Sequence, residues 1–161
     1  MIDIATFKQA MSSFPSGVTV ITVLNEQGKL TGMTVSAFSS LSLEPPLVLF
    51  CPDYRANSYP VLMQQKKFAI HILTAEQEQE AWAFASKSSD KSQGINWQLS
   101  ALGNPLLENA LTTIECELWR EYAGGDHAIV VGEVKNILFS PYRTDPMIYC
   151  RGKILAPAQP A

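Results

Sequence analysis

The pattern of apolar and polar positions along the chain predicts mostly extended segments. Residues 17–24, GVTVITVL, are dense in β-branched side chains and predict a strand, and the turn-forming NEQGK after it predicts a β-hairpin. Pro45 and Pro46 cannot donate ladder hydrogen bonds, so they mark the start of a buried strand, LVLFC. Further strands are expected at FAIHIL (68–73), at the alternating TTIECELW (112–119), at HAIVVGEVKNILF (127–139) and at MIYC (147–150).

Helical spacing and capping signals predict two or three short helices. Apolar side chains recur at helical intervals in residues 3–14, and Pro15 ends that segment. Two more helices are indicated, one capped by Asn57 or Ser58 with Pro60 in its first turn, and one over residues 76–85 preceded by the capping-box pair Thr74 and Gln77. Residues 86–104 are rich in Ser, Lys, Asp, Asn and Gly and predict a long surface loop. This set of elements favours a mainly β fold with peripheral helices, arranged as a closed or partly closed antiparallel barrel.

Composition is consistent with one globular domain. The chain has 161 residues, 47% hydrophobic and 17% charged, so we expect one domain over residues 1–155 and a flexible Ala/Pro tail over residues 156–161. A net charge of −3 gives no general attraction to nucleic acid or to anionic lipid, so neither is expected as a partner. No apolar run approaches the ~18 residues of a membrane span, and the first residues lack the pattern of a signal peptide.

The cysteines indicate a reducing environment. Cys51, Cys116 and Cys150 form no CxxC pair, and each lies in an apolar or alternating stretch typical of buried free thiols. The prediction is a cytoplasmic protein without disulfides.

Several familiar catalytic motifs are missing from the sequence. It contains no GxGxxG, GxxxxGK, HExxH or GxSxG, and His71 and His127 are its two histidines. Rossmann, P-loop, zincin and hydrolase functions therefore lack their usual support, and no protein-bound metal is expected. His71 lies in mid-strand and is expected to be a satisfied interior or interface residue. A chain without an obvious nucleophile or acid/base pair suits a reaction whose chemistry is carried by a cofactor.

Blocks of the sequence, in this order, resemble the flavin reductase-like family: FPSGVTVITV, GMTVSAFSSLSLEPPLVLFC, RANSYPVL, FAIHIL, the pair Phe84–Ala85, GNPLL and GDHAIVVGEV. The resemblance covers the chain from about Phe7 to Lys153. It implies an antiparallel split β-barrel of the FMN-binding type and an NAD(P)H:flavin oxidoreductase that supplies reduced flavin to a partner monooxygenase. It also implies a homodimer that uses FMN or FAD, with NADH or NADPH as hydride donor; the sequence leaves both choices open.

The resemblance also assigns site residues. The isoalloxazine ring would be lined by Thr34, Val35, Ser36, Ser39, Ser40 and Cys51, with Phe84 as a neighbour. Small hydroxyl residues let backbone N–H groups approach the polar edge of the ring, where reduction places negative charge. The flavin phosphate would be held by Arg55, Asn57 and Ser58 at a helix N-terminus. On the nicotinamide side, the catalytic residue would be His127, which orients the donor, with Gly125 and Asp126 shaping the turn.

Each of these features also has a plainer interpretation. The Ser-rich run is otherwise a loop that leads into a strand, Arg55 a solvated charge and His127 a turn residue. A non-enzymatic flavin-binding or redox-sensing protein on the same fold is the alternative function, and a dimeric β-barrel interaction module is a further one. Relatives often carry an aromatic residue where this chain has Ser92, so no substrate range is inferred from that loop.

Overall fold

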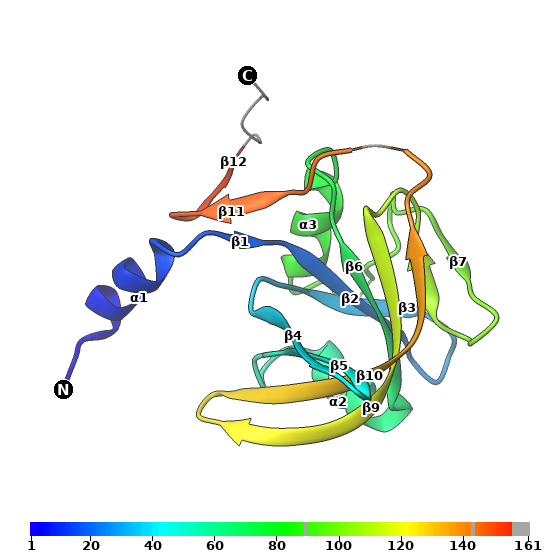
Figure 1. Ribbon diagram of the computed structural model, residues 1–161, viewed down its shortest axis with the longest axis horizontal. Coiled ribbons are helices and arrows are strands. Elements are labelled where there is room, and N and C mark those ends of the chain that lie inside the picture. Colours follow the sequence, from blue (N-terminus) through cyan, green and yellow to red (C-terminus); the bar gives the residue numbers. More distant parts are fainter. Residues whose placement is uncertain (89, 143, 156–161) are drawn as a thin grey trace.

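The computed structural model describes residues 1–88, 90–142 and 144–155, and the expected flexible tail, residues 156–161, lies outside them. In this part of the chain, antiparallel strands surround a core that three helices flank (Figure 1). The mainly β, antiparallel fold class is therefore confirmed. The helices are α1 (Ile4–Ser12), α2 (Ser58–Gln65) and α3 (Glu78–Ala85).

Seven strands form the main sheet, in the order β3-β2-β6-β9-β10-β5-β4. Their bounds are β2 (Thr19–Leu24), β3 (Leu30–Val35), β4 (Phe38–Leu43), β5 (Pro46–Phe50), β6 (Lys67–Ile72), β9 (Thr112–Gly124) and β10 (His127–Phe139). Two smaller sheets contain β1 (Ser16–Gly17), β11 (Ile148–Cys150) and β12 (Lys153–Leu155), and β7 (Trp97–Leu99) with β8 (Pro105–Leu107).

The two outermost strands of the main sheet are neighbours in sequence. β3 ends at Val35 and β4 begins at Phe38, so Ser36 and Ala37 alone connect the two ends of the strand order. A connection this short spans roughly 11 Å at most. The sheet must therefore curl until its two ends come close, which is compatible with a split barrel. We call the connection at residues 36–37 the seam.

The main sheet is buried on both faces near β2. Ile21 packs into one cluster with Phe50 and Phe68, whose rings meet edge to face at 5.4 Å. Val20, on the opposite face of the same strand, packs into a second cluster with Phe84 of α3. Burial on both faces explains why this strand is a continuous β-branched run. The expected strand over residues 17–24 is divided at one position, between β1 and β2.

The first half of β9 departs from the half-buried strand that its alternation predicts. Thr113 and Glu115 are 6% and 1% exposed, so the polar side of the strand is covered as well. Glu115 accepts hydrogen bonds from the amides of Asn104 and Asn136 at 3.0 Å each and from the hydroxyl of Ser100. The pKa of Glu115 is below its ordinary value. Burial alone would raise this pKa, but the three hydrogen bonds stabilise the carboxylate more than burial destabilises it.

The prediction of a long surface loop over residues 86–104 is wrong in two respects. It contains β7, which pairs with β8, and the side chains of Lys91 and Ile95 in it are 6% and 7% exposed. Apolar Ile95, Trp97 and Leu99 occupy alternate positions in this stretch, which is typical of a strand. The average composition of the stretch is polar, so a prediction from composition missed the strand. The short strand β12 was also not expected.

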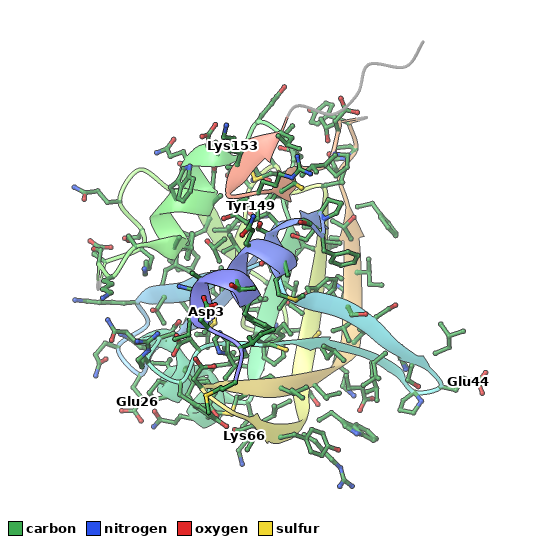
Figure 2. The ribbon with its side chains drawn as sticks, turned by 90° about the vertical axis from the view of Figure 1, so that its left-hand side faces the viewer. Asp3, Glu26, Glu44, Lys66, Tyr149 and Lys153 are labelled. Atoms are coloured by element: carbon green, nitrogen blue, oxygen red, sulfur yellow. The ribbon has the colours of Figure 1, made fainter. Side chains whose placement is uncertain are left out.

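The capping signals predict the starts of α2 and α3 to within two residues, but the expected capping hydrogen bonds do not always form. α2 begins after Asn57, yet the Asn57 side chain makes no capping hydrogen bond. α3 begins at Glu78, two residues after the expected start, and the Gln77 side chain accepts from the Thr74 backbone N–H at 3.0 Å. Figure 2 shows Glu44 at the tip of the β4–β5 hairpin, where the strand predicted from Pro46 begins.

α1 forms as its helical spacing predicts and projects from the body of the molecule (Figure 1). Asp3 caps it by accepting from the backbone N–H of Thr6 at 2.9 Å. None of its residues is buried: Phe7 and Met11, on its apolar side, are each 55% exposed. In the described ranges, no helix is both long enough and apolar enough to span a bilayer.

Candidate active site

A cleft of about 690 Å³ opens at the seam. Four segments build its walls: residues 32–37 at the end of β3, residues 51–58 leading into α2, the end of α3 with the residues that follow it, and His127 at the start of β10. The volume lies within the range of about 300–1,000 Å³ typical of small-molecule sites. We call this space the main cleft.

The main cleft contains most residues that the resemblance assigns to a site. Those lining it are Thr34, Val35, Ser36, Cys51, Arg55, Asn57, Ser58, Phe84 and His127. Four assigned residues do not line it: Ser39, Ser40, Gly125 and Asp126. Ser39 and Ser40 lie beyond the seam on β4, where the Ser39 hydroxyl donates to the Ser40 carbonyl at 2.9 Å. Gly125 and Asp126 form the β9–β10 turn, and their place on the nicotinamide side stays a prediction.

Thr34 connects the two sides of the main cleft. Its hydroxyl donates to the backbone carbonyl of Ala81 in α3 at 2.6 Å. The proton of this hydroxyl is therefore engaged within the protein, and the side chain acts as a tie between β3 and α3. Ser36, at the seam, is exposed and lines the main cleft.

Cys51 supplies an apolar part of the wall. It is partly buried, and burial raises the pKa of its thiol, so the uncharged form prevails at neutral pH. A neutral thiol and the ring of Phe84, which is 2% exposed, both line the main cleft and suit the less polar part of a planar ligand.

The groups suited to a phosphate lie further along the wall segment that begins at Cys51. Asn57 precedes α2 and Ser58 is its first residue, and both line the main cleft at this helix N-terminus. The Tyr59 N–H already donates to the Ala56 carbonyl at 3.0 Å, and Pro60 has no N–H, so the Asn57 and Ser58 side chains are the main polar groups here.

Arg55 is 85% exposed and pairs with Asp53, Nη2 to Oδ2, at 2.8 Å. The hydrogen bond from Arg55 is the main reason that the pKa of Asp53 falls to about 2. An anion that binds here must share Arg55 with Asp53.

Sequence reasoning missed Lys87 and Lys91 as cleft residues. Both line the main cleft just after α3. Lys91 is 6% exposed, its ammonium donates to the backbone carbonyl of Ser86, and burial lowers its pKa. The signal available in the sequence was a pair of lysines in a stretch otherwise treated as a solvated loop.

His127 stands at the mouth of the main cleft with one ring nitrogen already used. Its Nδ1 lies 2.7 Å from Oδ1 of Asp126, and the His127 side chain is 42% exposed. The hydrogen bond from His127 is the main reason that the pKa of Asp126 is lowered, so the carboxylate is ionised and Nδ1 is the donor. Nε2 is then the ring atom available to a ligand.

His71 is the satisfied interior residue that its position predicts. It is fully buried, its Nδ1 lies 3.0 Å from the Val20 carbonyl, and its Nε2 accepts from the Leu107 N–H at 3.0 Å. Burial lowers its pKa to about 4, so the ring is neutral. Across the described ranges, no three His, Cys, Asp or Glu side chains gather in a way that would hold a metal ion.

Comparison with known sequences places the chain among flavin reductases. A family model described as flavin reductase like domain matches residues 11–156. The reductase subunit HsaB of a flavin-dependent monooxygenase of Mycobacterium tuberculosis is 37% identical over 152 residues, which are 94% of this chain and 81% of that protein. The FMN reductase (NADH) SmoA of Agrobacterium fabrum is 34% identical over 148 residues, 91% of this chain and 82% of that protein.

Solved structures agree with the sequence comparison. The NADH:FAD oxidoreductase SgcE6 of Streptomyces globisporus superimposes with a TM-score of 0.92 at 35% identity, covering 100% of this chain and 98% of that one. The flavin reductase PheA2 gives a TM-score of 0.88 at 34% identity, covering 98% and 100% of the two chains. With both its sequence and its fold matching, this chain belongs to the flavin reductase like domain family.

Proposed function

We propose that this chain reduces FMN or FAD with a hydride from NADH, or from NADPH in its place, in the main cleft. The observation that carries the proposal is the cleft at the seam, whose lining combines partly apolar contacts with a helix N-terminus and Arg55. An isoalloxazine ring needs the apolar contacts, and a flavin phosphate needs the helix N-terminus and the cation. Relatives named as an NADH-dependent FMN reductase and an NADH-dependent FAD reductase support the same reaction.

The residues of the main cleft fit a flavin. Ser36, Cys51 and Phe84 would border the ring, while Asn57 and Ser58 at the start of α2 would meet the phosphate. Flavin supplies the hydride-accepting chemistry when it is bound, and the protein supplies position. Holding a donor ring against an acceptor ring accounts for most of the rate gain expected from such a site. His127, at the mouth, would orient the donor through Nε2 while Asp126 fixes the opposite nitrogen.

The function is tested by following NADH and NADPH oxidation with FMN, FAD and riboflavin as acceptors. The expected result is turnover that depends on added flavin. Flavin binding without turnover would favour the alternative, a flavin-binding or redox-sensing protein. Absence of both flavin binding and turnover would leave an interaction module and would contradict the proposal.

The Arg55→Ala variant should weaken FMN binding about tenfold and leave riboflavin binding nearly unchanged. A charged hydrogen bond to phosphate is lost, but Arg55 is exposed and shared with Asp53, so the lower part of the usual range applies. Fluorescence titration of FMN and riboflavin against both proteins measures the two affinities. Equal losses for the two ligands would place Arg55 outside the phosphate site.

The biological setting follows from the relatives and the cysteines. HsaB is the reductase subunit of a flavin-dependent monooxygenase, which supports a partner oxygenase as the consumer of reduced flavin here too. The three cysteines are free thiols, which supports the cytoplasm as the compartment. We also infer that residues 1–155 act as one domain, because the family model spans nearly all of them.

A homodimer is proposed from the exposed apolar residues of α1. A nine-residue helix is marginal in water unless its apolar side is packed. No residue of α1 is buried against this chain, and Phe14 just after it is 80% exposed. A second copy would supply the missing contact, in line with the resemblance.

Light scattering at micromolar concentration should therefore give twice the 17.7 kDa mass of one chain. Phe7→Ser, which removes an apolar side chain from α1 without touching either cluster of the core, should shift the mass toward one chain. A wild-type mass of one chain would refute the dimer.

A further inference from the structure

Asp53 is the one acidic side chain among the described residues that line the main cleft. It lies on the segment that leads into α2, between Cys51 and the residues assigned to the flavin phosphate. Its side chain is 28% exposed, and its pKa, lowered mainly by the hydrogen bond from Arg55, leaves the carboxylate ionised at neutral pH. A negative charge at this position opposes the binding of a phosphate.

The Asp53 carboxylate occupies the edge of the Arg55 guanidinium that a phosphate would use. Nε of Arg55 donates to Oδ1 and Oδ2 of Asp53 at 3.2 and 3.3 Å, and Nη2 donates to Oδ2 at 2.8 Å. The backbone N–H of Arg55 also donates to Oδ1, at 2.8 Å. A guanidinium binds carboxylates and phosphates through the same pair of parallel N–H donors. Asp53 is therefore an internal anion, placed on the donors that the proposed phosphate contact needs.

The backbone at Asp53 is tied to the start of β10. Asp53 forms an antiparallel bridge pair with His127. Next to this pair, the Ala128 N–H donates to the Pro52 carbonyl at 3.0 Å. The carboxylate is therefore carried by a fixed backbone, whereas the long Arg55 side chain is 85% exposed and has room to turn. Arg55 can change partners while Asp53 stays in place.

Competition between two anions for one cation lowers the affinity for the anion that comes from outside. A phosphate that takes the Arg55 fork must displace the Asp53 carboxylate, so the apparent affinity falls by the fraction of time that the fork is free. When the phosphate leaves, the guanidinium regains a partner and is not left unpaired. Exposed ion pairs contribute little free energy, so the reduction in affinity should be several-fold rather than many orders of magnitude.

Moderate affinity for flavin suits the proposed function. A reductase that supplies reduced flavin to a partner oxygenase must release it, and a flavin held too tightly would stay in the main cleft. We propose that the Asp53 carboxylate competes with the flavin phosphate for Arg55, which lowers the affinity for FMN and favours release of the reduced flavin. Asp53 is then a positioning residue that acts through Arg55. This inference rests on the proposed function.

The Asp53→Asn variant should bind FMN about fivefold more tightly than the wild type and bind riboflavin, which has no phosphate, with unchanged affinity. Asn keeps an oxygen that accepts from the Arg55 backbone N–H, so the turn is retained while the charge is lost. Asp53→Ser also keeps such an acceptor and should tighten FMN binding in the same way, so the test does not depend on one variant folding. Fluorescence titration with FMN and with riboflavin measures the affinities.

The same substitution in an Arg55→Ala background separates competition from simple repulsion between charges. Without the guanidinium there is nothing to compete for, so Asp53→Asn should then change FMN affinity by less than about twofold. The titrations are run at physiological ionic strength, where charges that are not in contact are largely screened. The difference between the two backgrounds is the coupling between Asp53 and Arg55.

Other outcomes would overturn the proposal and are separable from a failure of the proposed function. Weaker FMN binding by Asp53→Asn would show that Asp53 orients Arg55 for the phosphate, and unchanged binding would show that it has no influence. An equal gain in both backgrounds would indicate charge repulsion without competition. Equal gains for FMN and riboflavin would place the effect at the ring or in the fold. Wild-type protein that binds neither flavin would instead contradict the proposed function itself.

Discussion

Replacing Gly32 by Ala should destabilise the fold by about 3 kcal/mol and damage the main cleft at the same time. A Cβ atom at this position would stand 2.1 Å from the backbone carbonyl oxygen of Ile21, a distance that the paired strand β2 can relieve only by moving. The same atom would stand 3.1 Å from Cδ1 of Phe84, which lines the cleft. Both a strand pair and the packing of α3 on β3 would have to shift.

Thermal unfolding measures this loss. A change of about 3 kcal/mol lowers the melting temperature by roughly 10 °C in a chain of this size. Gly17→Ala is the matched control, because a Cβ atom there meets nothing within 4 Å and the backbone is not in the left-handed region. A Gly32→Ala variant as stable as Gly17→Ala would show that β2 and β3 can separate without cost, contrary to the packing described here.

The need for glycine at position 32 was not apparent from the sequence, and the reason is general. Gly32 begins the block GMTVSAFSSLSLEPPLVLFC, and its small size matters because β2 and α3 approach it from other parts of the chain. Periodicity describes neighbours along one segment, so it identified the strand. It carries no information on what packs against one position from a distance.

The same distinction separates the elements that were predicted from those that were missed. β10 and β2 are long or β-branched, and α2 has a proline in its first turn, so local signals were sufficient. β7 has three residues in a stretch of polar composition and exists because it pairs with β8 and because Ile95 nearby enters the second cluster. Short strands fixed by pairing leave a weak local pattern.

For the site, resemblance supplied what elementary chemistry could not. Thr34, the nearby pair Cys51 and Arg55, and His127 come from three separate segments, and the sequence alone gives no reason to bring them together; the curl of the sheet at the seam does so. The structure also adds one role. The Thr34 hydroxyl donates to the carbonyl of Ala81, so this side chain holds α3 in place, while its place beside the flavin ring stays a prediction.

Replacing His127 by Asn should lower kcat/KM for the nicotinamide substrate by about tenfold to a hundredfold while flavin affinity barely changes. The Asn amide can keep the contact that Nδ1 makes with Asp126 at 2.7 Å, but it has no atom at the position of Nε2. His127 is 42% exposed at the mouth of the main cleft, so the change removes a contact to the incoming donor without opening the core.

Stopped-flow reduction of bound flavin, run beside a flavin titration, separates the two effects. His127→Gln is the matched variant, because its longer side chain can place an amide donor near the position of Nε2 and should restore part of the rate. A folding defect would lower both flavin affinity and the reduction rate, whereas a turn residue without contact to the donor would change neither. An unchanged reduction rate in a well-folded His127→Asn would remove His127 from the mechanism and leave the β9–β10 turn with a purely structural role, since Gly125 already supplies the left-handed backbone at φ 75° that the turn requires.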